Sequence, residues 1–204
     1  MQHLDTFFAS RKSEYQLIDI HRKDDLSLLA ELINAELSQE FQSNVMFICT
    51  HNSRRSQLAE FLFRLSLQYF EIENVQVYSG GTEATAFNER MIRALRNEGF
   101  EFSELENDEN PIYISDLEGM GQRMFSKVYN DEFNPSKDFL AIMVCDHADE
   151  NCPLVIGASH RIALPFLDPK EFDGTSNEEK AYSDKVKEIG REMVFLAEKI
   201  KTMG

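Results

Sequence analysis

Apolar side chains along the chain recur at helical spacing in some segments and form short continuous runs in others. Helical spacing covers residues 25–41 and, in a second stripe, residues 176–202, so the pattern predicts an amphipathic helix in each segment. Because the first of these helices precedes every strand-like run, we interpret residues 1–43 as a helical N-terminal extension and residues 44–204 as the main domain.

Two strand-and-helix units follow the extension. The first consists of the apolar run 45–49, a polar loop and the helical stretch 56–70. The second consists of the alternating segment 75–79, which ends at two glycines, and a helical face that stops at Gly99. Strands that alternate with helices in this way are typical of a parallel sheet.

The middle of the chain breaks this pattern. Residues 101–138 are acidic, irregular and rich in asparagine and aspartate. This composition favours an inserted segment, and two stretches within it, 112–114 and 124–129, are apolar enough to predict short strands. We therefore expect a hairpin-like insertion in the main domain.

Two further strands are expected after the insertion. The run 139–144 is continuously apolar, which is typical of a strand buried on both faces of a parallel sheet. The segment 161–166 contains a proline and is expected at a sheet edge. Together these segments predict an α/β fold with an open, mostly parallel four-stranded sheet flanked by helices, and with its ligand site at the carboxyl ends of the strands.

Composition and charge exclude several classes of protein. The 204 residues are 42% apolar and contain no apolar run long enough to cross a bilayer, which suits one soluble domain with a sizeable core. Basic residues number 21 and acidic residues 36, and the net charge of −15 repels nucleic acid and anionic lipid, so neither is an expected partner. The N-terminus lacks the pattern of a secretory signal, which predicts a cytoplasmic protein with reduced thiols.

The loop after the first strand carries the main chemical signal. Cys49 closes the strand, and Arg55 stands six positions later, where a helix begins. Loop amides and the helix N-terminus can converge on a tetrahedral oxyanion, and their positive field favours the nucleophilic thiolate of Cys49, to which Ser56 can donate a hydrogen bond. We expect the side chains of His51 and Arg54 to face solvent. The alternative for Cys49 is a purely structural role as a small apolar residue. The expected oxyanion-binding residues are Thr50, His51, Asn52, Ser53, Arg54, Arg55 and Ser56.

Two further features bear on the same chemistry. Asp168 precedes a proline after the last strand, where it can protonate a leaving oxygen, although Asp-Pro is also common in turns and at helix starts. Cys145 and Cys152 lie seven positions apart and suggest two thiols that exchange with an adduct on Cys49. The alternatives are that both are incidental, or that they bind a metal together with His147.

With these motifs in this order, the sequence resembles the low-molecular-weight protein tyrosine phosphatase superfamily, and within it the thioredoxin-coupled arsenate reductases. The shared pattern is a Cys-x5-Arg-Ser loop at 49–56, a late Asp-Pro at 168–169 and a Cys-x6-Cys segment at 145–152. The resemblance covers about residues 44–202, interrupted by the insertion.

The resemblance implies a mechanism and a reductant. Cys49 attacks arsenate that is held by the loop amides and Arg55, and Asp168 assists the departing oxygen. Cys145 then attacks Cys49 with release of arsenite, Cys152 attacks Cys145, and thioredoxin reduces the resulting disulfide. No cofactor is required for this chemistry. Some members hold a potassium ion that steadies the loop, on the residues equivalent to Asn52, Glu60 and Ser79.

Departures from the family pattern bear on the substrate, and two alternatives stay open. The usual loop glycine is His51 here, and Lys170 and Glu171 follow the Asp-Pro where tyrosine phosphatases often carry aromatic residues, which favours a small oxyanion. The first alternative is a phosphatase that hydrolyses phosphotyrosine or small phosphoesters through a cysteinyl phosphate. The second is a redox sensor without turnover, in which oxidised Cys49 is capped by one of the other two cysteines.

Overall fold

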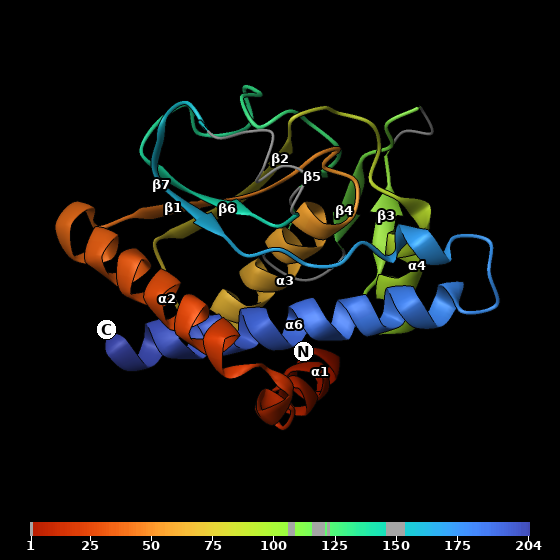
Figure 1. The fold of residues 1–204 in the computed structure, drawn as a ribbon, viewed down its shortest axis with the longest axis horizontal. Helices are drawn as coiled ribbons and strands as arrows, with labels where there is room; N and C mark the ends of the chain where they lie inside the picture. The colour runs from red at the N-terminus through yellow and green to blue at the C-terminus, as the bar shows by residue number, and fades with distance from the viewer. Residues whose placement is uncertain (1, 106–108, 116–120, 122, 146–153) are drawn as a thin grey trace.

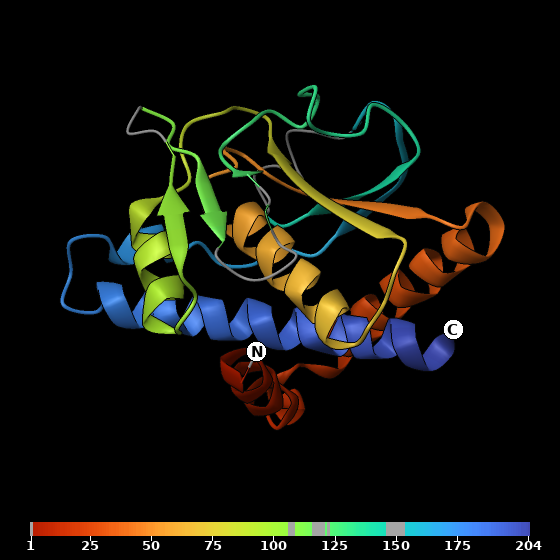
Figure 2. The same ribbon diagram turned by 180° about the vertical axis from the view of Figure 1, so that it is seen from behind.

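The computed structural model describes residues 2–105, 109–115, 121, 123–145 and 154–204. Figures 1 and 2 show the chain from opposite sides. In chain order its helices and strands are α1 (Gln2–Lys12), η1 (Tyr15–Leu17), α2 (Ile20–Glu40), β1 (Ser43–Cys49), α3 (Arg55–Tyr69), β2 (Val75–Gly81), α4 (Glu89–Asn97), β3 (Phe102–Glu104), β4 (Tyr113–Ser115), β5 (Arg123–Met124), β6 (Phe139–Met143), β7 (Ala158–Ala163), η2 (Pro169–Phe172) and α6 (Glu178–Met203).

Four parallel strands form the main sheet, in the order β2-β1-β6-β7. The inner strands β1 and β6 are almost entirely buried, which explains their continuous apolar runs. β7 lies at the edge as expected, although it occupies 158–163 rather than 161–166, and Pro165 lies beyond its end. The four-stranded parallel α/β fold predicted from the sequence is confirmed.

Helix α6 is the centre of the helical layer, because α1, α2, α3 and α4 all pack against it. In Figures 1 and 2, α3 lies between the main sheet and α6, and α1 lies on the side of α6 away from the sheet. The helix expected at 25–41 begins earlier, at Ile20, because Asp19 caps it by accepting from the His21 amide. No helix among the described residues is both long enough and apolar enough to span a membrane.

A small antiparallel sheet, β3-β4-β5, forms in the segment expected to be an insertion. β4 lies where a strand was expected at 112–114, whereas β3 was not expected. The strand expected at 124–129 is wrong, because β5 ends at Met124. The chain then follows the end of β2, where Gly81 and Val128 form a single parallel bridge.

Arg22 connects α2 to the segment that leads to Asp168. Its Nε donates to Oε2 of Glu192 on α6 at 2.7 Å, and its Nη2 donates to the carbonyl oxygens of Leu164 and Pro165 at 3.3 and 3.1 Å. Burial raises the pKa of Glu192, and the positive charge of Arg22 opposes this rise. Helix α2 therefore helps to hold the segment that leads to Asp168.

Replacing Arg22 with methionine is expected to lower the free energy of unfolding by about 3 kcal/mol at neutral pH, because it leaves a buried carboxylate without its partner. The folded-state pKa of Glu192 then rises further above its unfolded value, so the loss should shrink as the pH falls through that pKa. Urea unfolding near pH 7 and pH 5 measures both effects. A second substitution, Glu192→Gln, should recover most of the loss; an equal loss at both pH values would contradict this role of the pair.

Candidate active site

The thiol of Cys49 lies at the start of the loop that joins β1 to α3. The residue is 4% exposed, and its Sγ lies 3.0 Å from Oγ of the fully buried Ser56. Ser56 belongs to the first turn of α3, so the Cys49 thiol lies beside the N-terminus of this helix. The contact predicted from the sequence is therefore present, and it places the hydroxyl of Ser56 beside the Cys49 thiol.

The loop turns its carbonyl groups outward. A trans peptide points the N–H of the next residue away from its C=O, so the loop amides are directed toward the centre and form a nest for an anion. Each carbonyl oxygen from 49 to 53 accepts a hydrogen bond: Thr82 N donates to Cys49, Glu83 N to Thr50, Ser126 Oγ to His51, Gln57 Nε2 to Asn52 and Asn88 N to Ser53.

Asn52 holds the loop from the protein interior. Its φ of +46° lies in the left-handed region, which asparagine tolerates better than most residues. Its Nδ2 donates to Oγ of Ser56 at 2.8 Å and of Ser79 at 2.9 Å, and its Oδ1 accepts from the Lys127 amide at 2.9 Å. A Cβ on Gly81 would lie 2.8 Å from the Asn52 nitrogen, so only glycine permits β2 to approach the loop this closely. The Asn52 side chain therefore shapes the nest from behind.

Arg55 and Asp168 meet beside the loop. Arg55 Nη2 donates to Asp168 Oδ2 at 2.7 Å, and Nη1 donates to the Phe166 carbonyl at 2.8 Å. Asp168 Oδ1 also accepts from the Lys170 amide and so caps η2, which means that the aspartate both begins a helix and faces the loop arginine. Arg55 Nε is buried without a partner among the described residues, which suits a donor reserved for a bound anion.

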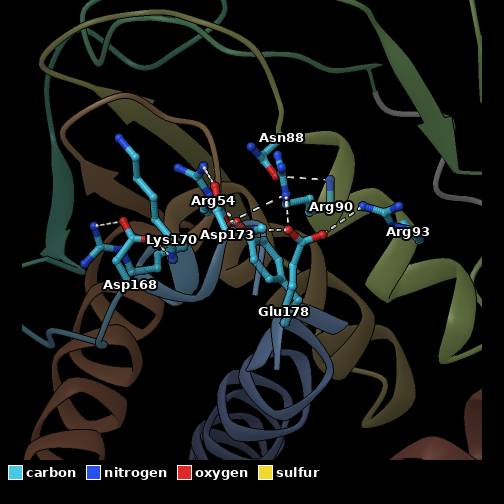
Figure 3. A network of polar contacts seen from close by, with 11 residues as sticks. Arg54, Asn88, Arg90, Arg93, Asp168, Lys170, Asp173 and Glu178 are labelled. Atoms are coloured by element: carbon cyan, nitrogen blue, oxygen red, sulfur yellow. Dashed lines mark hydrogen bonds and ion pairs between the residues drawn. The ribbon is translucent and has the colours of Figure 1, made fainter. Parts of the chain in front are cut away.

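Figure 3 shows Arg54 at one end of a polar network that reaches α6 and α4. Arg54 Nε donates to Tyr182 Oη at 2.9 Å, and Tyr182 donates to Asp173 Oδ1 at 2.7 Å. Asp173 also lies 3.8 Å from Arg90, which pairs with Glu178 at 2.9 Å. The expectation that Arg54 faces solvent is wrong, because its side chain is 13% exposed and packs against Tyr182 of α6.

Tyr182 is a residue that the sequence did not indicate. Burial, and then its hydrogen bond to Asp173, raise the pKa of Tyr182 to about 12, so the phenol keeps its proton as a donor. It stands 128 positions from Arg54 in the chain, and no spacing motif connects the two. His51, in contrast, has a half-exposed side chain that lies 3.6 Å from Glu83, in agreement with the expectation.

A second thiol lies at the same edge of the sheet. Cys145 follows β6, the strand beside β1, and is 1% exposed. Its Sγ lies 3.6 Å from Oγ1 of Thr50, the residue after Cys49. Cys152 and His147 lie outside the described residues. Among the residues that are described, no three or more His, Cys, Asp or Glu side chains gather as a metal site requires.

The polar groups at the expected potassium position already contact one another. Asn52 Nδ2 donates to Ser79 Oγ, and Asn52 Oδ1 accepts from the Lys127 amide. Glu60 Oε1 lies 3.4 Å from Arg64 Nη2, so a guanidinium already faces the carboxylate. A second cation beside this arginine would be repelled, and the described residues do not fit a potassium ion.

The parallel α/β sheet and the Cys-x5-Arg loop after its first strand define the class as proteins with a phosphatase-type anion loop. The family model for low molecular weight phosphotyrosine protein phosphatase matches residues 44–117. An arsenate reductase of Bacillus licheniformis is 30% identical over 158 residues, which cover 77% of this chain and 96% of the relative. An arsenate reductase of Bacillus subtilis is 30% identical over 155 residues, which cover 76% and 94%. The chain belongs to the low molecular weight phosphotyrosine protein phosphatase family.

Solved structures share the fold. A low molecular weight protein tyrosine phosphatase from Bacillus subtilis has a TM-score of 0.54 at 20% identity, over 78% of this chain and 97% of that one. A low molecular weight protein tyrosine phosphatase from T. tengcongensis has a TM-score of 0.54 at 18% identity, over 78% and 99%. These likenesses concern the fold, and they confirm the expected phosphatase-like architecture.

Proposed function

We propose that the protein is an arsenate reductase with Cys49 as its nucleophile and with Cys145 and Cys152 as a redox relay. The observation that carries the proposal is the position of Cys145, whose thiol is buried at the anion loop, 3.6 Å from Thr50 Oγ1. Hydrolysis of a phosphoester by this loop needs only one thiol. The relatives named arsenate reductase, at about 30% identity, support the same function.

Arsenate binding uses the loop amides, the N-terminus of α3 and Arg55. All three place positive charge where the tetrahedral anion would lie. Asp168 pairs with one edge of the Arg55 guanidinium, so arsenate has to share or take over these donors. The carboxyl group of Asp168 then lies beside the arsenate oxygens.

In the first step the Cys49 thiolate attacks arsenic(V) and forms a sulfur–arsenic bond. One arsenate oxygen leaves, and Asp168 supplies a proton so that it departs as water. Ser56, 3.0 Å from the thiol, stabilises the thiolate before attack. Arsenic keeps its oxidation state, and the product of the step is an arseno-cysteine.

In the second step the electrons move. The Cys145 thiolate attacks Cys49 Sγ, a disulfide forms, and the electron pair of the broken sulfur–arsenic bond stays on arsenic, which leaves as arsenite. Cys152 then attacks Cys145, releases the Cys49 thiolate and leaves a Cys145–Cys152 disulfide. Two electrons from a dithiol protein, with thioredoxin as the proposed donor, restore the reduced relay.

A single turnover without reductant tests this proposal. Reduced protein mixed with arsenate should release one equivalent of arsenite and lose two hydrogen atoms in mass, with peptide mapping placing the disulfide at Cys145 and Cys152. The same mixture with phosphate in place of arsenate should give neither change. Arsenite release without a disulfide, or no arsenite at all, would contradict the relay.

The pairing of Arg55 with Asp168 favours a second candidate function, hydrolysis of phosphate monoesters. Phosphate and arsenate have nearly the same shape and charge, so the loop cannot separate them. Asp168 would protonate the ester oxygen, and water would then release phosphate from Cys49. Lys170 and Glu171 follow the Asp-Pro, so small phosphoesters suit this site better than phosphotyrosine.

Replacing Asp168 with asparagine is expected to lower kcat for para-nitrophenyl phosphate by about 100-fold, because asparagine cannot protonate the leaving oxygen. Phosphate should bind at least as tightly, since a neutral amide no longer competes for Arg55. The measurements are kcat and the inhibition constant of phosphate, with Asp184→Asn on the exposed face of α6 as control. An unchanged kcat, or weaker phosphate binding, would contradict a role of Asp168 as proton donor and would limit it to capping η2.

A further inference from the structure

A cavity of about 270 Å³ lies behind the anion loop, and the proposed chemistry does not use it. Its walls come from α3, from β2 and from the segment 123–133. Among the described residues that line it, one is a carboxylate, Glu60, and three are cations, Arg64, Arg123 and Lys127. Of these cations, Arg64 is the one that pairs with the carboxylate of Glu60.

Glu60 is the buried member of an internal ion pair. It is 2% exposed, and its Oε1 lies 3.4 Å from Nη2 of Arg64, one turn further along α3. The Arg64 side chain is 23% exposed, and its guanidinium lies 5.9 Å from the centre of the Tyr78 ring. A carboxylate this deeply buried is costly without a counter-charge, and Arg64 supplies that charge from the same helix.

Lys127 joins this cavity to the nucleophile. It is 5% exposed, its backbone amide donates to Asn52 Oδ1 at 2.9 Å, and its Nζ lies 4.9 Å from the centre of the Phe125 ring. Asn52 in turn donates to Ser56, whose hydroxyl contacts the Cys49 thiol. A shift of the cavity wall therefore reaches the thiol through a short chain of hydrogen bonds.

We propose that Arg64 is a positioning residue that holds the anion loop from behind, in place of a bound potassium ion. The guanidinium of Arg64 would repel a further cation near Glu60. A tethered guanidinium loses no translational freedom when it pairs, whereas a free ion does. The order of the loop is therefore independent of monovalent cations. The expectation that turnover is independent of potassium rests on the proposed function. The expectation that the order of the loop is independent of potassium does not.

The first test compares the wild-type protein in potassium chloride and in choline chloride at equal ionic strength. Two readouts need no turnover: Tm, and the rate at which iodoacetamide alkylates Cys49, resolved from the other cysteines by peptide mass spectrometry. The third is hydrolysis of para-nitrophenyl phosphate. We expect each readout to be the same in both salts. A potassium-dependent rise in any of them would overturn the proposal.

The second test uses Arg64→Ala, which removes the guanidinium that pairs with the carboxylate of Glu60. In choline chloride, alkylation of Cys49 should change by about tenfold, because the loop loses its support, and potassium chloride should bring the rate back toward that of the wild type. Arg64→Lys keeps the charge and should stay independent of potassium. The matched control is Lys180→Ala, which breaks an exposed pair with Asp184 at the same i,i+4 spacing and should respond to neither salt.

An Arg64→Ala variant that reacts like the wild type in choline chloride, or that potassium does not restore, would overturn the proposal. If this variant does not fold, Arg64→Gln keeps most of the side-chain volume and carries the same expectations. A wild-type protein without hydrolytic or reductase activity, but with the same Tm and Cys49 alkylation rate in both salts, would count against the proposed function and would support the role of Arg64.

Discussion

Replacing Cys49 with serine is expected to abolish both arsenate reduction and phosphoester hydrolysis. Cys49 is the proposed nucleophile in both reactions, and a serine hydroxyl, which stays protonated at neutral pH, attacks far more slowly than a thiolate. We expect a loss on the order of 10⁴-fold or more. The measurements are initial rates of para-nitrophenyl phosphate hydrolysis and of arsenate-dependent NADPH oxidation with thioredoxin and its reductase.

The control for this variant is its binding and stability. Serine fits the buried position of Cys49 without a change of shape, so Tm should stay close to that of the wild type. Phosphate should still bind in calorimetry, since the loop amides and Arg55 remain. Activity within tenfold of the wild type would place the nucleophile elsewhere in the molecule.

Replacing Cys145 or Cys152 with serine is expected to separate the two activities. Either variant should lose steady-state arsenate reduction, because the Cys145–Cys152 disulfide that thioredoxin is proposed to reduce cannot form. Both should retain most of the hydrolysis of para-nitrophenyl phosphate, because the proposed hydrolytic mechanism uses Cys49, Arg55 and Asp168 but no second thiol. The same two assays, run on matched preparations, measure the split.

The two relay variants should also stop at different points. Cys145→Ser should hold arsenate on Cys49 and release no arsenite. Cys152→Ser should release one equivalent of arsenite and stop as a disulfide between Cys49 and Cys145. Continued turnover of arsenate by Cys152→Ser with thioredoxin would show that the relay does not pass through this residue.

The main sheet was predictable from the sequence because its inner strands are buried on both faces. Residues 45–49 of β1 and all of β6 are continuous apolar runs, and such runs have few alternatives when polar loops bound them. The short strands of the second sheet carry a weaker signal. β5 has only two residues. The rest of the segment expected as a strand at 124–129 runs beside the end of β2, where Val128 forms a single bridge with Gly81.

The anion loop was predictable because its residues are contiguous in the sequence. The residues that support the loop are far apart in the sequence and were not predictable. Cys49, Arg55 and Ser56 fall within eight positions, and one helix start places them together. The contact of Arg54 with Tyr182 depends on how α6 packs, which no local pattern records. Polar residues that far apart in the chain are brought together only by the complete fold.

The expected potassium position shows the same limit of prediction from sequence. The residue types at Asn52, Glu60 and Ser79 match the resemblance, but they do not reveal what stands next to them. Arg64, one turn beyond Glu60, faces the carboxylate and changes the charge of the site. Matching ligand positions in a sequence therefore predicts a bound cation, whereas we propose that the guanidinium of Arg64 takes its place.

Arsenate-dependent oxidation of NADPH by the reduced protein, thioredoxin and thioredoxin reductase tests the arsenate reductase proposal most directly, when it is run beside para-nitrophenyl phosphate hydrolysis. We predict oxidation that requires arsenate and disappears in Cys145→Ser, while that variant still hydrolyses the ester. Hydrolysis by the wild-type protein without arsenate-dependent oxidation of NADPH would contradict the reductase and identify a phosphatase. Inactivity in both assays would contradict both enzymatic functions and favour a redox sensor.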